Sequence, residues 1–299
     1  MSLLNVDAAL APRPAAEDAE APTPGSQRPI GDHLVEQRSL TEHDLATVRQ
    51  WQAKSGTRFG EAALQLGLIT PAQLDAALAQ QYGYPLLDEG LDFAPELVAA
   101  RDPGHVISER MRTLRTHLVL HWREAADAKA LAVVSAQRGE GRSFVVANLA
   151  ASFAQMNLRT LAVDLDLRHP RLHRLFGVSN HQGMSGLLAA RTGLSEAWSL
   201  LGGPLAVLPA GPTPPNPQEL LAPAILGPVL QALKREFDVL IIDSPAWTSG
   251  ADALLIGAQV DDALVITQPG RALQSTVREV VDALRGGGAR VVGAVLNEH

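Results

Sequence analysis

The chain has 299 residues, which suits two domains or one larger domain with an appendage, and 46% of them are apolar, which suffices for a hydrophobic core. A formal net charge of −7 argues against a nucleic-acid-binding surface, and the absence of cysteine excludes disulfides, thiolate zinc sites and cysteine nucleophiles. No apolar run reaches the roughly 18–20 residues that span a bilayer, and the N-terminus has no signal-peptide pattern. We therefore expect a cytoplasmic chain with no nucleic-acid partner and no integral membrane segment.

The first third of the chain predicts a tail and a small helical domain. Residues 1–27 are rich in Ala, Pro and Glu, a composition typical of a disordered tail. Residues 28–84 predict a helical repeat domain. Residues 30–81 within it contain an internal repeat, and each copy predicts a short helix, a turn and a longer helix that begins after a threonine, Thr41 or Thr70. A helical spacer that only buries its own apolar faces is the alternative. The repeat pairs Gly31 with Gly60, Leu45 with Leu74, and Gln52 with Gln81.

Residues 85–104 carry turn signals and predict a linker. The segment that follows is a predicted helix on which Glu109, Arg112 and Arg115 lie three positions apart. Because residues three apart share one face of a helix, these charges form a stripe. From the spacing alone, a solvated stripe is the simpler interpretation.

From residue 129 onward, apolar strand candidates alternate with helical segments. The apolar runs are nearly continuous, as in residues 239–242, and such runs are typical of strands buried on both faces. This pattern predicts an α/β fold with a parallel sheet flanked by helices, whose ligands bind beyond the carboxyl ends of the strands. The predicted strands are 130–135, 160–165, 204–209, 238–243, 262–267 and 290–296.

Residues 135–143, Ser-Ala-Gln-Arg-Gly-Glu-Gly-Arg-Ser, follow the first strand and open a predicted helix, which is the setting of a phosphate-binding loop. Gly139 and Gly141 would let the backbone approach a polyphosphate, and the helix N-terminus would attract its charge. Arg142 stands where such loops usually carry lysine, and Ser143 is placed to bind Mg²⁺ through its hydroxyl. A turn without a ligand is the alternative for this segment alone.

Aspartates end two further strands. Asp164 and Asp166 are two apart, so they lie on the same side of one strand end, and Asp243 ends another strand in the manner of a Walker B segment. Together with Ser143 they supply the hard oxygen ligands that suit Mg²⁺. Helix capping would explain either strand end in isolation. Phe144 occupies the place of the third glycine of a dinucleotide fingerprint, which disfavours dinucleotide binding.

The basic run 168–174, Arg-His-Pro-Arg-Leu-His-Arg, has no established metal-ligand spacing. We interpret it as a solvated or phosphate-facing loop rather than a metal site.

With these motifs in view, residues 105–299 resemble the P-loop type of bacterial tyrosine kinase (BY-kinase) that accompanies polysaccharide chain-length determinants. The arginine in the loop and the helical domain before it are similar to the EpsG subgroup of exopolysaccharide operons. The resemblance rests on Glu109-x2-Arg112-x2-Arg115, the loop at 139–143, Asp164-x-Asp166-x-Arg168-x-Pro170, the segment 208–221, and Ile241-Ile242-Asp243-Ser244-Pro245.

This resemblance implies an ATP- and Mg²⁺-dependent protein tyrosine kinase acting in exopolysaccharide biosynthesis or export. Asp166 would be the base, and Asn297 matches an asparagine that contacts adenine in related ATPases. The implied catalytic residues are Arg142, Asp164, Asp166 and Asp243; the implied ATP-binding residues are Arg138, Gly139, Glu140, Gly141, Arg142, Ser143, Phe144 and Asn297; the implied metal ligands are Ser143, Asp164 and Asp243.

The resemblance also implies partners. A transmembrane chain-length determinant would recruit the chain to the inner face of the cell membrane through its cytoplasmic segment, and residues 109–115 would mediate self-association instead of forming a solvated stripe. A catalytically weak ATP-binding switch or scaffold is the alternative function. It is favoured by Arg142 and by the lack of a tyrosine cluster before His299, since Tyr82 and Tyr84 are the only tyrosines.

Residues 29–81 resemble a second family, the N-terminal domain of secretion and pilus ATPases (the MshEN type), some members of which bind cyclic di-GMP. The second copy of the repeat fits this family well, whereas the first departs from it at Pro29, Arg38 and Arg49. We expect a similar fold, and we leave open whether these residues bind a cyclic dinucleotide.

Overall fold

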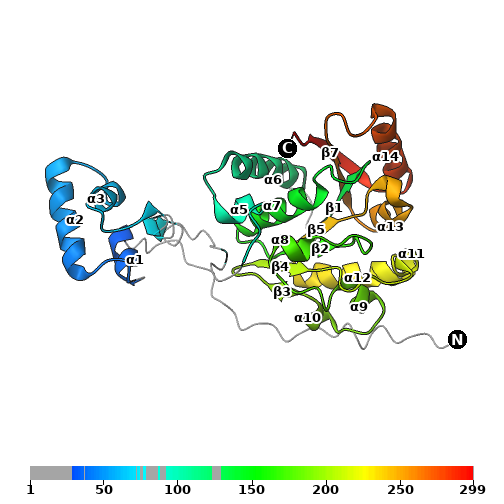
Figure 1. Ribbon diagram of the computed structural model, residues 1–299, viewed down its shortest axis with the longest axis horizontal. Helices are drawn as coiled ribbons and strands as arrows, with labels where there is room; N and C mark the ends of the chain where they lie inside the picture. The colour runs from blue at the N-terminus through cyan, green and yellow to red at the C-terminus, as the bar shows by residue number, and fades with distance from the viewer. Residues whose placement is uncertain are drawn as a thin grey trace. The chain divides into compact units, whose positions relative to one another are not determined.

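The computed structural model describes residues 29–36, 38–71, 73–74, 77–78, 87, 92–122 and 129–298. The predicted tail at 1–27, as well as Tyr82 and Tyr84, lies outside the described residues. The chain divides into two compact units, and the division falls at residue 87 (Figure 1). Among the described helices, none is both long and apolar enough to cross a bilayer.

The smaller unit is helical and begins with α1 (Ile30–Glu36), α2 (Glu42–Ser55) and α3 (Phe59–Gln65). Thr41 caps α2, because its hydroxyl accepts the Asp44 N–H at 3.2 Å while the Asp44 carboxylate accepts the Thr41 N–H at 3.0 Å. Thr70 and Gln73 repeat this reciprocal pair one copy later. Both predicted threonine caps are therefore present, and each satisfies backbone donors that a helix start leaves open.

The internal repeat has a packing cause. A Cβ added at Gly31 would lie 2.5 Å from Leu45 Cδ1, and one added at Gly60 would lie 2.6 Å from Leu74 Cδ1. The glycine of each copy thus allows the short helix to approach the leucine of the longer one. The recurring Gly and Leu in the sequence mark the same helix-to-helix contact made twice.

The larger unit is built on a seven-stranded sheet, in the order β3-β4-β2-β5-β1-β6-β7. All neighbours pair in parallel except β3 and β4, which are antiparallel. The strands are β1 (Lys129–Ser135), β2 (Thr160–Asp164), β3 (Ser199–Leu200), β4 (Leu205–Leu208), β5 (Val239–Asp243), β6 (Asp262–Thr267) and β7 (Arg290–Leu296).

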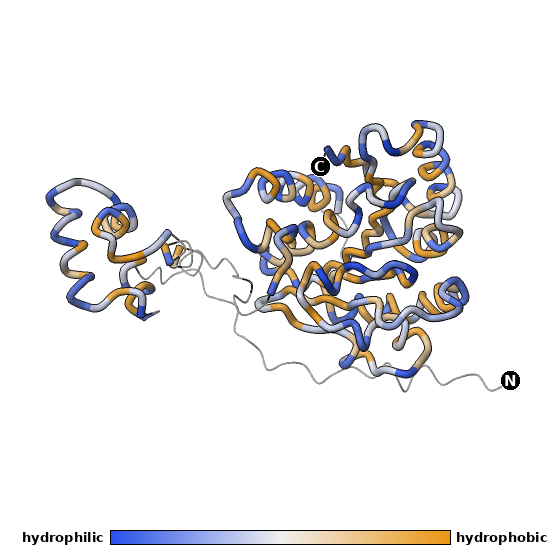
Figure 2. The backbone as a smooth tube through the Cα atoms, in the orientation of Figure 1, coloured by the Kyte–Doolittle hydropathy of each residue, from blue (hydrophilic) through white to orange (hydrophobic). Residues whose placement is uncertain are grey.

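Alternate residues of the strands feed two hydrophobic layers. In β1, Leu131 and Val133 face one cluster, whereas Ala130, Ala132 and Val134 face the other. Figure 2 shows the apolar segments concentrated along the strands inside this unit. Helices on the first face are α5 (Val98–Arg101), α6 (Val106–Trp122), α7 (Arg142–Ala154) and α8 (Leu172–Leu175); those on the second are α9 (Met184–Leu188), α10 (Leu194–Ala197), α11 (Pro217–Leu220), α12 (Pro223–Glu236), α13 (Asp252–Gly257) and α14 (Gln274–Gly286).

The predicted fold class is confirmed: a parallel sheet flanked by helices, preceded in the sequence by a small helical domain. Each of the six predicted strands coincides with an observed one to within one residue at either end. The sequence analysis missed β3, which has only two residues, both exposed. So short a segment cannot show the alternation or the apolar run by which strands are recognised.

Residues 92–104 fall in the predicted linker, yet the structure packs much of this segment onto the α/β unit. Phe93 and Leu97 are buried in the same cluster as α7. Asn148 of α7 accepts the Ala99 N–H at 2.8 Å, and Gln155 donates to the Ala99 carbonyl at 2.7 Å. Turn signals in the sequence report the backbone conformation but not which side chains are buried, so this attachment was not predicted.

Candidate active site

The site forms where β2, β5 and β1 end side by side. Asp164 and Asp243 are register partners at the ends of β2 and β5, and Asp243 also pairs with Val133 of β1. The glycine loop follows β1 and leads into α7, whose N-cap is Gly141 with φ +93°. No side chain caps this helix, so the N–H groups of its first turn, which point back toward the glycine loop, have no capping side chain as acceptor.

The Glu140 carboxylate stabilises the glycine loop through hydrogen bonds from backbone N–H groups. Its side chain is fully buried, and its carboxylate accepts the N–H of Gln137 at 2.6 Å and that of Gln268 at 3.1 Å. The second contact ties the loop to the segment after β6. Glu140 was predicted as an ATP-binding residue, and its buried carboxylate leaves only its backbone to make such a contact.

The two glycines of the loop accommodate close neighbours. A Cβ at Gly139 would lie 2.7 Å from Arg271 Nη1, and one at Gly141 would collide with Asn297 Nδ2. The Asn297 amide donates to the Glu140 carbonyl at 3.0 Å. Asn297, predicted to contact adenine, therefore lies directly on the loop. Phe144, another predicted ATP-binding residue, packs against the cluster that α7 shares with the sheet.

Arg142 is 8% exposed and turns into the protein. Its Nε donates to the Ser244 carbonyl at 2.8 Å, and its Nη1 donates to the Ser135 hydroxyl and to the Gln137 carbonyl. Only Nη2 makes no hydrogen bond to a described residue. The guanidinium thus links the ends of β1 and β5, instead of extending along the loop as a free cation.

The same guanidinium lies between two carboxylates. Arg142 Nη2 is 3.8 Å from Asp166 Oδ2, and Arg142 Nε is 3.9 Å from Asp243 Oδ1. Burial raises the pKa of Asp243 to about 6, although Arg142 and the Ser143 hydroxyl, which donates to Asp243 Oδ2, both lower it. Arg142 therefore compensates part of the charge that burial makes costly.

Asp164 organises the loop after β2. Its Oδ1 accepts the Asp166 N–H at 3.1 Å, and its Oδ2 accepts the N–H groups of Arg171 and Leu172 at 2.9 and 3.0 Å. Burial and the nearby Asp243 raise the pKa of Asp164 well above its usual value, while these N–H groups lower it. Asp164 was predicted as a metal ligand, and both of its oxygens are engaged by the backbone.

Asp166 is 7% exposed and accepts the His169 N–H at 2.9 Å through Oδ1. Its Oδ2 faces Arg142 across the 3.8 Å gap. The predicted base therefore lies in the same site as the glycine loop and Asp243.

The donor set fits Mg²⁺ in part. Asp243 Oδ1 is buried without a hydrogen-bond partner, and the Ser143 hydroxyl lies against the other oxygen of the same carboxylate. Within the described ranges, no group of three or more His, Cys, Asp or Glu side chains is arranged to hold a metal ion. Mg²⁺ is commonly held by one or two carboxylates together with water and substrate phosphates, so Asp243 and Ser143 suffice as protein ligands.

The predicted self-association residues lie apart from this site, on α6. Arg112 donates to Glu109 at 2.8 Å and to the Pro103 carbonyl at 2.9 Å, and Arg115 donates to the Ser152 carbonyl of α7. The stripe thus contributes contacts within the chain, while the Glu109 side chain stays 67% exposed.

Sequence analysis missed one residue of the site, Asp252. This aspartate is 1% exposed at the start of α13, and Arg168 donates to it at 2.6 Å. Arg168 belongs to the Asp-x-Asp-x-Arg motif, so the pair holds the loop after β2 against α13. An aspartate in the first turn of a helix has an ordinary explanation in the helix dipole, which hid its role.

No family model matches the chain. Its sequence is 30% identical over 202 residues to the tyrosine-protein kinase YwqD of Bacillus subtilis, a match that covers 67% of this chain and 85% of YwqD. It is 31% identical over 192 residues to the tyrosine-protein kinase CpsD of Streptococcus agalactiae, covering 64% of this chain and 82% of CpsD.

Solved structures give the same result. The kinase domain of the Escherichia coli tyrosine kinase ETK aligns with a TM-score of 0.65 at 31% identity, over 69% of this chain and 80% of that domain. The septum site-determining protein MinD of Pyrococcus horikoshii, solved with Mg-ADP, aligns with a TM-score of 0.50 at 26% identity, over 57% of this chain and 70% of MinD. By its sequence and by its fold, the chain belongs to the family of bacterial tyrosine-protein kinases.

Proposed function

We propose that this chain is an ATP- and Mg²⁺-dependent protein tyrosine kinase that acts in exopolysaccharide biosynthesis or export. One observation carries the proposal: the uncapped start of α7, the Asp243–Ser143 pair and Asp166 meet at the ends of three adjacent strands. Phosphoryl transfer needs positioning and charge neutralisation more than covalent chemistry, and this arrangement supplies both. The Mg-ADP bound to MinD, which shares the fold, gives further support.

In this proposal each element of the site has one task. The backbone of residues 139–143 and the N-terminus of α7 bind the phosphates, and Mg²⁺ bound by Asp243 and Ser143 would neutralise developing charge. Asp166 accepts the proton of the incoming tyrosine hydroxyl. Asp164 positions Asp166 by accepting its backbone N–H.

In this proposal Arg142 mainly stabilises the site by connecting the ends of β1 and β5. Three of its N–H groups donate hydrogen bonds to protein oxygens. The guanidinium therefore cannot bind a phosphate with two parallel hydrogen bonds, as an extended arginine side chain would. Its Nη2 end contributes positive charge beside Asp166. The loop N–H groups then carry most of the phosphate binding.

The same burial of Arg142 favours a second candidate function, an ATP-binding switch or scaffold that regulates polysaccharide export without transferring phosphate. Transfer of labelled phosphate from ATP separates the two. The assay pairs the full chain with the cytoplasmic segment of a chain-length determinant, and Asp166→Asn is the matched control. Transfer that Asp166→Asn abolishes supports the kinase, whereas ATP binding without any transfer supports the switch.

We extend the proposal to its partners: a membrane chain-length determinant would recruit the chain, and residues 109–115 would mediate self-association. The Glu109–Arg112 ion pair lies at the surface, where such pairs contribute only about 0–1 kcal/mol, so it would specify an interface rather than stabilise the fold. Light scattering of wild type against the triple variant Glu109→Ala/Arg112→Ala/Arg115→Ala tests this. An unchanged particle mass would contradict it.

A further inference from the structure

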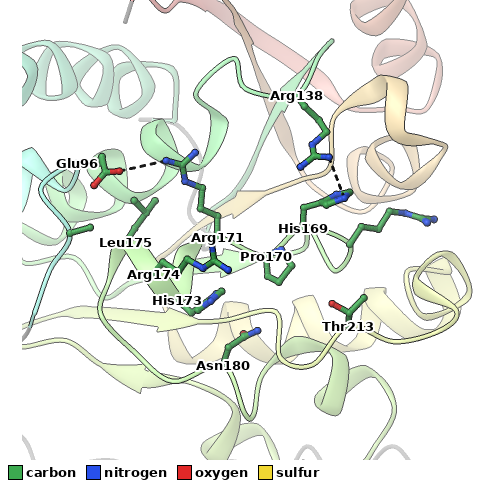
Figure 3. A pocket seen from close by; sticks show the side chains of 12 residues that line it. Glu96, Arg138, His169, Pro170, Arg171, His173, Arg174, Leu175, Asn180 and Thr213 are labelled. Carbon is green, nitrogen blue, oxygen red and sulfur yellow. Dashed lines mark hydrogen bonds and ion pairs between the residues drawn. The ribbon is translucent and has the colours of Figure 1, made fainter.

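A basic cavity of about 740 Å³ lies beside the glycine loop. The basic run after β2 forms much of its wall, and Arg138 is the one residue of the loop that lines it, so the cavity adjoins the phosphate-binding backbone without including Gly139 to Ser143. Figure 3 shows its side chains, with Arg138 and His169 together on one side and Glu96 with Arg171 on another.

The cavity carries uncompensated positive charge. Arg168 is neutralised by Asp252 at 2.6 Å, and Arg171 has a looser partner in Glu96 at 3.6 Å, a pair whose two side chains are about half exposed. Arg138 and Arg174 have no carboxylate partner in the described part of the chain. Burial and the neighbouring Arg174 lower the pKa of His173, so this histidine is a neutral hydrogen-bonding group at pH 7.

The wall is anchored to the active site. Asp164 accepts the N–H groups of Arg171 and Leu172, and Asp166 accepts the N–H of His169, so both aspartates fix the basic run. Opposite it, Asn180 exchanges two hydrogen bonds of 2.9 Å with the backbone of Gly211 and so fixes the rim near Thr213. A ligand in the cavity would therefore be held at a set position relative to the base.

We propose that this cavity is an acceptor subsite that binds anionic side chains flanking the tyrosine of a protein substrate. The inference rests on the proposed kinase function. Arginine is suited to carboxylate and phosphate groups because its planar fork donates two parallel hydrogen bonds. The cavity is linked to the base through His169, which contacts Arg138 at 3.3 Å and donates its N–H to Asp166 at 2.9 Å. Two arginines without carboxylate partners in this cavity would favour a tyrosine with acidic neighbours over one with neutral neighbours.

Peptide binding tests the subsite without depending on phosphate transfer. Fluorescence anisotropy of the full chain with Mg²⁺ and a non-hydrolysable ATP analogue would compare three labelled peptides: one with glutamates around a tyrosine, one with glutamines, and one with glutamines and a neighbouring phosphotyrosine. We expect an anionic peptide to bind about tenfold more tightly than the neutral one, and the advantage to shrink with added salt. The better anionic peptide identifies carboxylate or phosphate as the ligand.

Two substitutions make the test specific. Arg174→Gln should remove most of the preference, and Arg174→Glu should reverse it in favour of a lysine-flanked peptide. Arg278→Gln is the matched control, because Arg278 is an exposed arginine of α14 that does not line the cavity. Folding is checked by the thermal transition of each variant.

Two results would overturn the proposal. One is equal binding of the acidic and neutral peptides. The other is a preference for the acidic peptide that appears only when the ATP analogue is left out, because the cavity would then belong to the nucleotide site. Failure of the proposed function is separate, since it appears as ATP binding without transfer while the peptide preference persists.

Discussion

Arg142 in the site and Arg174 in the neighbouring cavity have opposite electrostatic surroundings. Arg142 is buried, is hydrogen-bonded by the ends of β1 and β5, and lies within 4 Å of Asp166 and Asp243. Arg174 lines the cavity that adjoins the glycine loop, is exposed and has no carboxylate partner among the described residues. One arginine compensates charge within the protein, and the other presents charge to the solvent.

The difference has an energetic reason. A buried carboxylate is costly unless a cation or hydrogen bonds compensate it, so Arg142 is needed for the site to fold even without a ligand. An exposed cation has little effect on stability, so Arg174 can be selected for what it binds. The loop arginine therefore belongs to the architecture of the site and the cavity arginine to recognition.

Removing each arginine in turn tests this difference most directly. Arg142→Ala should lower the free energy of unfolding by about 3–5 kcal/mol, because it leaves Asp243 and Asp166 buried without their cation. Arg174→Ala should change it by less than about 1 kcal/mol. Urea denaturation followed by circular dichroism measures both, and similar losses in the two variants would contradict the distinction.

Nucleotide binding tests the role of Asp243, one of the buried carboxylates beside Arg142. Asp243→Ala should weaken Mg²⁺-dependent ATP binding by about 100-fold, because it removes a metal ligand and leaves the Ser143 hydroxyl without its acceptor. Calorimetry with Mg²⁺ and with a chelator separates the metal-dependent part. Asp282→Ala on α14 is the control, since Asp282 is exposed. Absence of ATP binding by the wild-type chain would refute the nucleotide site itself.

The buried site around Arg142 and the strand-end aspartates could be predicted from the sequence better than the exposed cavity. Glycines, a loop arginine and strand-end aspartates have fixed spacings, because a phosphate loop and two adjacent strand ends impose them. Their chemical class could be predicted, but not the direction in which Arg142 points. That direction depends on Ser135 and Ser244, two serines at the ends of different strands, which no local pattern connects.

The cavity could not be predicted in the same way. The basic run 168–174 was interpreted as a solvated or phosphate-facing loop, which describes its composition correctly. Its function as a wall depends on Glu96, Asn180 and Thr213, which come from three other segments. Similarly, Asp252 lies 84 positions from Arg168 in the sequence, so their pairing is a product of the tertiary fold.

Two glycines with nearly the same φ angle show how tightly the loop is enclosed. Gly141 has φ +93° and touches Asn297, whereas Gly288 has φ +94° and open space where a Cβ would lie. Gly288→Ala should cost about 1–2 kcal/mol from the left-handed backbone alone. Gly141→Ala should cost more and weaken ATP binding, because Asn297 must move.

The double variant Gly141→Ala/Asn297→Ala isolates that contact. It should bring the cost of Gly141→Ala close to that of Gly288→Ala, as thermal unfolding would show. A double variant no more stable than Gly141→Ala would mean that Asn297 is not the obstacle and that the loop is confined by other contacts.

The smallest expected effect concerns Asp261, a half-buried charged residue whose exposure lies between that of buried Arg142 and that of exposed Arg174. Burial raises the pKa of Asp261, but the hydrogen bond from Lys234 at 2.6 Å and the Ala130 N–H outweigh it, so the pKa lies below its usual value. A carboxylate with a lowered folded-state pKa stabilises the fold above its unfolded-state pKa of about 3.9, and this contribution is lost as the pH falls through the folded-state value.

Asp261→Asn should therefore lower the melting temperature slightly at pH 7, and the difference from wild type should shrink below about pH 4. Because the carboxylate is 37% exposed, solvent screening keeps the effect small, as for an exposed pair. A difference in melting temperature that stays constant from pH 7 to pH 3.5 would show that Asp261 acts through packing and not through its charge.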